Sequence, residues 1–133
     1  MTGVEIIGTL LLNDLPLLAV VPLEQIKADA LPDGVALPAL LVTDISMVER
    51  QTLRRGEQVR VTERVRATVR ARTGDERRAV MKLVRSCCAD WTGNMDGATG
   101  IAVLTAGRGP GLVGVGNSFE QAQDFSVSFA EPS

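Results

Sequence analysis

The chain has 133 residues, the length of one domain, and its formal net charge is −2 from 14 basic and 16 acidic residues. That balance excludes a general attraction to nucleic acid or to an anionic membrane surface. Histidine is absent, which removes the commonest general base and the commonest metal ligand. The two cysteines are adjacent and cannot link distant segments, so we expect a single domain over residues 1–133 in a reducing compartment.

The N-terminal segment is predicted to be helical. Apolar residues recur at helical spacing over residues 3–12, and Asp14 with Pro16 indicates a second short helical turn over residues 15–20. Polar residues interrupt the apolar run well short of the roughly 20 residues needed to span a bilayer. Because no basic residue lies near the start, we expect neither a membrane span nor a signal peptide.

Two strands and two connections are expected next. Residues 23–28 are predicted to form a short strand, and the proline-rich stretch 29–38 a loop. Residues 39–48 are apolar and rich in β-forming side chains, which predicts a strand covered on both faces. The charged stretch 49–57 indicates an exposed hairpin connection, and it carries Arg54, Arg55 and Gly56.

The stretch 58–72 is the clearest strand in the sequence because its side chains alternate in polarity. One face carries apolar residues, interrupted by a single Glu63: Val59, Val61, Val65, Ala67, Val69 and Ala71. The other face is polar and basic: Arg60, Thr62, Arg64, Arg66, Thr68, Arg70 and Arg72. This pattern predicts one buried face and one polar face.

The second half begins with a helix capped by Asp75 and ending near residues 92–93. Its apolar stripe is Val80, Leu83, Val84, Cys87 and Trp91. A loop over 94–100, a strand over 101–106, a flexible glycine-rich tip over 107–116 and a strand over 119–130 follow. The predicted fold is therefore α+β: a mainly antiparallel sheet of four to five strands with two helices packed on one face.

No constellation of residues indicates catalysis, a cofactor or a metal, so we expect the chain not to be an enzyme. The stretch 109–114 matches G-x-G-x-x-G, but the residues after it predict a turn and a strand where a nucleotide site needs a helix. Cys87 is expected on the buried stripe of its helix, where cysteine acts as a small apolar residue. Asp90 and Asp96 lack the cleft that paired acid–base carboxylates need.

The basic stripe is the main candidate site, and the residues alone leave two interpretations of equal weight. It forms either a solvated face, partly neutralised by carboxylates such as Asp44, Glu120 or Asp124, or a subunit interface. Contact with DNA phosphates is less favoured, because no aromatic side chain is interleaved for base stacking. In the interface interpretation, acidic residues of a neighbour's 49–57 loop supply the counter-charges. The candidate interface residues are Arg60, Arg64, Arg66 and Arg70.

The order and spacing of several segments form a pattern across most of the chain. An N-terminal amphipathic helix precedes the run 31–42, a loop that ends in Leu-Pro-Ala and enters a strand, and then the long strand 59–71. The next helix carries Glu-Arg-Arg-Ala-Val-Met-Lys-Leu-Val over 76–84, and Gln-Asp-Phe-Ser-Val-Ser-Phe over 123–129 forms the closing strand. In this order and spacing the chain resembles the tail-terminator, or tail-completion, family of long-tailed bacteriophages.

The resemblance implies a structural protein of the virion, assembled in the host cytoplasm. It implies a ring, usually a hexamer, that caps the tail tube protein at the head-proximal end and docks the head connector, while DNA passes through the lumen. The expected docking loops contain Arg54, Arg55, Gly56, Gly107, Arg108, Gly109 and Gly111. The alternatives are another head–tail connector or neck protein, or a non-viral module that binds a small molecule.

Overall fold

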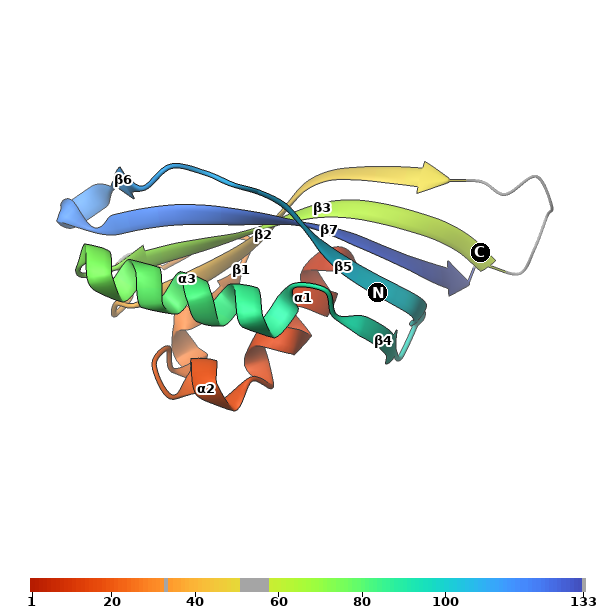
Figure 1. Ribbon diagram of the computed structural model, residues 1–133, viewed down its shortest axis with the longest axis horizontal. Coiled ribbons are helices and arrows are strands. Elements are labelled where there is room, and N and C mark those ends of the chain that lie inside the picture. The colour runs from red at the N-terminus through yellow and green to blue at the C-terminus, as the bar shows by residue number, and fades with distance from the viewer. Residues whose placement is uncertain (33, 51–57, 133) are drawn as a thin grey trace.

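The computed structural model describes residues 1–32, 34–50 and 58–132 (Figure 1). The elements in chain order are α1 (Gly3–Leu12), α2 (Leu15–Leu18), a 3-10 turn (Leu23–Gln25), β1 (Ile26–Ala28), β2 (Ala39–Arg50), β3 (Gln58–Ala71), α3 (Gly74–Cys88), β4 (Thr92–Met95), β5 (Ala98–Arg108), β6 (Leu112–Val113), a second 3-10 turn (Val115–Asn117) and β7 (Phe119–Pro132).

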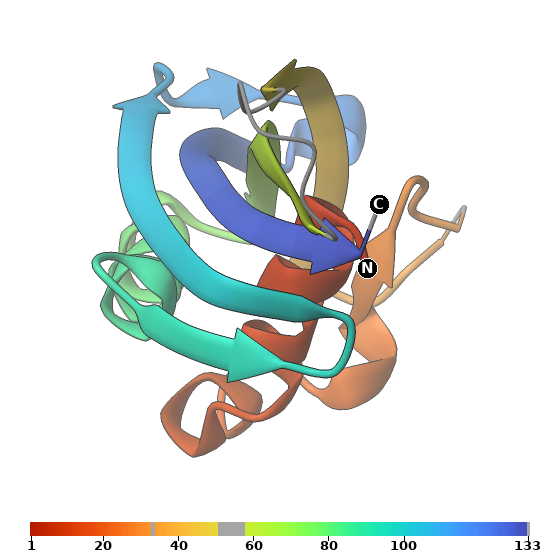
Figure 2. The same ribbon diagram turned by 90° about the vertical axis from the view of Figure 1, so that its right-hand side faces the viewer.

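All seven strands belong to one curved sheet. Its order is β1-β2-β3-β7-β5-β4, with β6 paired to the start of β7. β1 runs parallel to β2, and every other described pair is antiparallel. The helices lie on one side of the sheet (Figure 1). Viewed along the strands, the sheet curls, and α1 lies in the opening between its β1 and β4 edges (Figure 2).

The predicted fold class is wrong in three respects. The sheet has seven strands instead of four to five, and it is mixed because β1 is parallel to β2. The turn after residue 14 is a third helix, α2. The strand predicted over 23–28 is shorter, since its first residues form a 3-10 turn.

The two strands that the sequence analysis missed are short and carry no alternating pattern. β4 was predicted as the helix end and a loop, yet it forms a hairpin with β5 in which Met95 pairs with Ala98. The Asp96-Gly97 dipeptide between them is a strong hairpin signal, and Gly97 adopts a φ of 83°. β6 arises from two residues of the glycine-rich stretch that pair with the start of β7. Part of the stretch predicted as a flexible tip therefore pairs with the sheet.

Two strands and their connection also differ from expectation. β2 extends to Arg50, so Glu49 and Arg50 belong to the strand and not to the connection. Among the side chains of β2 that the structure describes, Ala39, Leu40 and Val42 are buried, and those from Asp44 to Ser46 are exposed. The rest of the predicted hairpin connection, including Arg54, Arg55 and Gly56, lies outside the described residues.

The core lies between the sheet and the helices, and the predicted alternation of β3 positions it. Val61, Val65, Ala67 and Val69 are buried on the helical side of the sheet. β7 contributes the largest buried side chains to the same face, Phe125 and Phe129. Burial of such side chains stabilises a fold by about 1.5–3 kcal/mol each.

Helix α3 differs from its prediction at both ends. Thr73, not Asp75, is the N-cap: its hydroxyl accepts a hydrogen bond from the Glu76 backbone N–H at 3.1 Å. The helix ends at Cys88, and the chain then passes through a turn, in which Asp90 has a φ of 61°, before β4 begins at Thr92. Cys88 is fully buried, whereas Cys87 is only partly buried and donates to the Leu10 carbonyl at 3.2 Å. Cys88, and not Cys87, therefore fills the buried position expected of a cysteine in this helix.

Glu63, the charged residue on the apolar face of β3, has a hydrogen-bond partner on that face. Its carboxylate accepts a hydrogen bond from the Gly3 backbone N–H in the first turn of α1, and only 8% of the residue is exposed. A free N–H at a helix start carries partial positive charge, so a carboxylate there is stabilising. A Cβ on Gly3 would lie 2.5 Å from Glu63 Oε2, which excludes a larger residue there without rearrangement. This contact fixes α1 against the sheet.

We predict that Glu63→Ala lowers the free energy of unfolding by about 1–3 kcal/mol, because the buried Gly3 N–H loses its acceptor. Chemical denaturation measures the change. Glu24→Ala is the control, since Glu24 is exposed, and it should shift stability by no more than about 0.5 kcal/mol. Equal effects of the two substitutions would show that Glu63 does not anchor α1.

Candidate functional site

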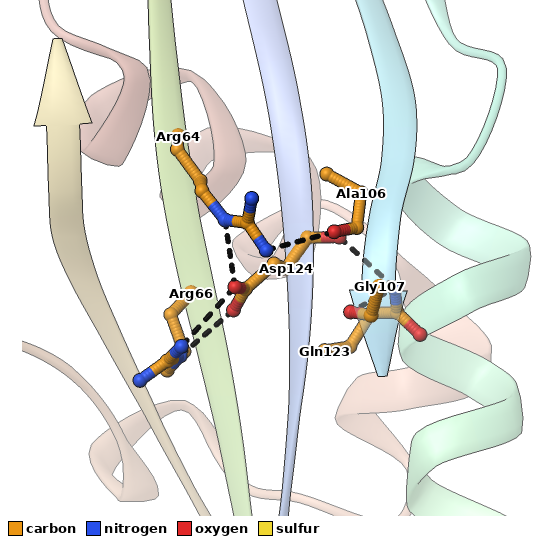
Figure 3. Close-up of polar contacts among 6 residues, drawn as sticks. All are labelled: Arg64, Arg66, Ala106, Gly107, Gln123 and Asp124. Atoms are coloured by element: carbon orange, nitrogen blue, oxygen red, sulfur yellow. Dashed lines mark hydrogen bonds and ion pairs between the residues drawn. The ribbon is translucent and has the colours of Figure 1, made fainter. Parts of the chain in front are cut away.

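The polar face of the sheet places the predicted arginines directly opposite carboxylates. β3 and β7 pair in antiparallel register over their whole lengths, so that Arg66 faces Asp124 and Arg70 faces Glu120. Arg64 Nε lies 2.8 Å from Asp124 Oδ2, and Arg66 Nε lies 2.7 Å from Asp124 Oδ1 (Figure 3). One carboxylate therefore holds two guanidiniums, and we call Arg64, Arg66 and Asp124 the Asp124 cluster.

The Asp124 cluster also forms a hydrogen bond with the end of β5. Arg64 Nη2 donates to the Ala106 carbonyl at 2.9 Å, so its side chain reaches from β3 across β7 to β5 (Figure 3). From the buried face, Gln123 Nε2 donates to the Gly107 carbonyl at 3.0 Å. The β5–β7 register shifts between Thr105 and Arg108, where regular pairing is interrupted. Side chains from both faces thus replace backbone pairing at this point.

Asp124 is charged in this setting. Its residue is 4% exposed, and hydrogen bonding by Arg66 is the largest influence on it, lowering the pKa of the carboxyl. Burial acts in the opposite direction but is outweighed, because Arg64 also donates and both guanidiniums are positive. In turn, the hydrogen bond to Asp124 raises the pKa of Arg66. The cluster is therefore a stable ionic unit at neutral pH.

The remaining arginines of the stripe are paired within the same chain. Arg70 Nε lies 2.5 Å from Glu120 Oε1, and Arg72 Nη2 lies 2.8 Å from Glu76 Oε2. Arg60 donates to the Gly100 carbonyl at 2.9 Å. In the interface interpretation, a neighbouring subunit was expected to supply the counter-charges of the stripe. The structure corrects this, because carboxylates on β7 of the same chain supply them. Of the three carboxylates considered, Glu120 and Asp124 neutralise the stripe, and Asp44 forms no ion pair among the described residues.

A shallow hollow of about 390 Å³ lies beside the Asp124 cluster, between β3, β7 and the residues that follow β5. Arg64, Arg66 and Arg108 line it together with Glu120 and Asp124. Asp124 is paired there with Arg64 and Arg66, and Glu120 is paired with Arg70, whereas Arg108 forms no ion pair among the described residues. The placement of Arg60, Arg64, Arg66 and Arg70 at a subunit boundary stays a prediction.

The predicted docking residues in the glycine-rich stretch lie on ordered backbone. Gly107 and Arg108 end β5, and the Gly109 N–H donates to the Ala122 carbonyl at 2.9 Å. A Cβ on Gly111 would collide with the Arg77 guanidinium of α3, which packs against this backbone. After Gly114 the chain forms a 3-10 turn and then β7, which confirms the turn and strand predicted there.

The sequence analysis missed two groups of charged residues. α3 carries Arg78, Lys82 and Arg85, whose spacing places them on one side of a helix. That spacing was visible in the sequence but was overlooked beside the stronger arginine stripe. The second group, Glu5, Asp29 and Asp44, comes from three separate segments that only the fold brings together around one hollow. No sequence signal indicates that group.

The part of the chain that the structure describes contains neither a candidate metal site nor a helix that could span a membrane. There, no three or more acidic or cysteine side chains are grouped so as to hold a metal ion. None of the helices there is long and apolar enough to cross a membrane.

Comparison with known proteins gives a likeness of fold. No family model matches the chain, and no curated protein matches it. Among solved structures, it is similar to a chain of the virion of a native gene transfer agent (GTA) particle, with a TM-score of 0.66 and 12% sequence identity. The match covers 93% of this chain and 91% of that chain. At this identity the likeness shows that the two chains share a fold over nearly their full lengths.

We predict that Asp124→Asn lowers the free energy of unfolding at pH 7 by about 1–2 kcal/mol, since two charge-assisted hydrogen bonds weaken while the guanidiniums stay partly solvated. The pKa of Asp124 is lower in the folded chain, so its stabilisation is complete above the unfolded pKa of about 3.9 and is lost as the pH falls below it. Denaturation curves at pH 7 and pH 3 measure the difference.

The wild-type chain and Asp124→Asn should therefore converge in stability at acidic pH. Asp96→Asn, at an exposed turn position, is the matched control and should change stability by no more than about 0.5 kcal/mol at either pH. A difference between wild type and Asp124→Asn that persists undiminished into acid would contradict an ionic role for this carboxylate.

Proposed function

We propose that the chain is a structural protein of a phage-type virion and that it acts without catalysis. The observation that carries this proposal is the likeness of fold, over 93% of the chain, to a chain of the virion of a gene transfer agent particle. The order of sequence segments that resembles the tail-terminator family supports the same class independently. Both point to an assembled particle rather than to a small-molecule-binding module.

Within that class we propose the tail-terminator role: a ring of six copies, the usual number in the family, that caps the tail tube at its head-proximal end. The sheet supports ring formation because both of its edges carry unpaired backbone. Among the described residues, β1 pairs only with residues 40–42 of β2, and β4 pairs only with residues 98–102 of β5. Different free edges on opposite sides of a domain permit head-to-tail contacts, which close into rings.

The partners implied by this role are the tail tube protein on one side of the ring and the head-completion or connector protein on the other. Of the residues proposed for docking, the structure describes Gly107, Arg108, Gly109 and Gly111, which lie at the end of β5 and just after it, and we propose this stretch as a docking segment. Binding residues favour such segments when a rigid sheet holds them. DNA is a partner only as it passes through the lumen.

A phage that lacks this gene tests the role. We expect tails that are abnormally long or that remain without heads, because nothing caps the growing tube. Negative-stain microscopy of lysates measures tail length and head attachment, and complementation with the wild-type gene on a plasmid is the control.

Tails of normal length that join heads would refute the terminator role. Tails of normal length that fail to join heads would instead favour the alternative, a connector or neck protein of the same virion. Normal, infectious particles would refute the virion assignment altogether.

A further inference from the structure

The first surface on which this inference depends is a groove between α3 and the end of β5. Arg78, Lys82 and Arg85 from the helix and Arg108 from the strand line it, with a volume of about 530 Å³. All four side chains are exposed, and no acidic residue lines the groove. Arg78 pairs with Asp75 at 2.9 Å, but both partners are largely in solvent, where such a pair is weak. We call these four residues the basic groove.

The second surface is a hollow of about 370 Å³ beside the N-terminus of α1. Glu5 from α1, Asp29 after β1, Asp44 from β2 and Glu63 from β3 line it, and no basic residue does. Glu63 is buried against Gly3, whereas the other three carboxylates are exposed and form no ion pair among the described residues. We call Glu5, Asp29 and Asp44 the acidic hollow.

The two surfaces lie at opposite edges of the sheet. The strand order puts β2, with the acidic hollow, near one edge and β5, with the basic groove, near the other. Figure 2 shows this separation, with β1 and β2 on the right of the molecule and β5 and α3 on the left. Like charges repel within each surface of an isolated chain, and joining the surfaces of two copies replaces that repulsion with attraction.

We propose that the basic groove of one subunit binds the acidic hollow of the next copy of this chain. The inference rests on the proposed ring, for which it names the contacting surfaces. A contact between two different surfaces is head-to-tail, so a pair of copies still has one free groove and one free hollow, and the arrangement repeats until it closes. DNA fits the basic groove less well, because no aromatic side chain lines it and the chain has a net charge of −2.

Charge reversal tests the proposal. One variant carries Lys82→Glu and Arg85→Glu, and a second carries Glu5→Lys and Asp44→Lys. We expect each variant alone to lose self-association, with a dissociation constant raised at least about tenfold, because two like-charged surfaces then meet. Mass by light scattering at low salt is the measurement. Glu24→Lys, outside both surfaces, is the control and should associate as wild type does.

Restoring the opposite charges should restore association. An equimolar mixture of the two reversed variants should form rings in which the variants alternate, because every contact then joins an acidic to a basic surface. A chain that carries all four substitutions keeps the wild-type net charge and should also associate. Association of the wild type should weaken as salt is raised from about 0.05 to 0.5 M. Circular dichroism checks that each variant is folded.

Several results would overturn the proposal. They are absence of wild-type association at low salt, undiminished association of either reversed variant, and failure of both the mixture and the four-fold variant to regain mass. If short duplex DNA binds wild type but not the variant reversed at Lys82 and Arg85, while association is unchanged, the groove contacts phosphate instead. The tail phenotype of the gene deletion is independent of these results, so a failure here would leave the terminator role standing.

Discussion

The pairing of β3 with β7 is the constraint on which the rest of the structure depends. Its register does two things at once: it places Val65 opposite Phe125 on the helical side and Arg66 opposite Asp124 on the other. A slip of one residue would send apolar side chains to solvent and would separate the guanidiniums from their carboxylate. The core and the ionic face therefore specify the same alignment, and β2 and β5 take their positions from it.

The elements that were predicted correctly are those with a long periodic pattern in the sequence. The bounds of α1 were correct, and the alternation of β3 identified its buried and polar faces. What failed was set by few residues or by distant contacts: β4 and β6 are too short to show a period, and the parallel partner of β2 is a three-residue strand. At the site, the arginine stripe was found, and two of the three carboxylates named for it, Glu120 and Asp124, do pair with it. Which arginine each carboxylate meets depended on strand order, which no local pattern encodes.

The charged side chains of this protein fall into two classes: those that form ion pairs within the chain and those that gather with charges of the same sign. On the open face of the sheet, arginines and carboxylates are paired within the chain, and the most buried of them, Asp124, holds two partners. At the two edges, charges of one sign gather, and among the described residues all of them except Arg78, which pairs with Asp75, form no ion pair. An ion pair made inside a subunit shapes that subunit, whereas an unpaired patch at an edge is a surface on which a second molecule gains free energy.

The position of β7 has a consequence for how the chain reaches its fold. β7 is the last strand in the sequence and yet lies in the middle of the sheet, between β3 and β5. Until it is synthesised, both neighbours present long unpaired edges, and its contacts with β3 span about 60 residues of intervening chain. Such non-local pairing is slow, and the partly folded intermediates are prone to aggregation because their strand edges are exposed. A nascent or prematurely terminated chain therefore lacks the central strand that aligns the sheet, and only a chain that contains β7 can complete this fold.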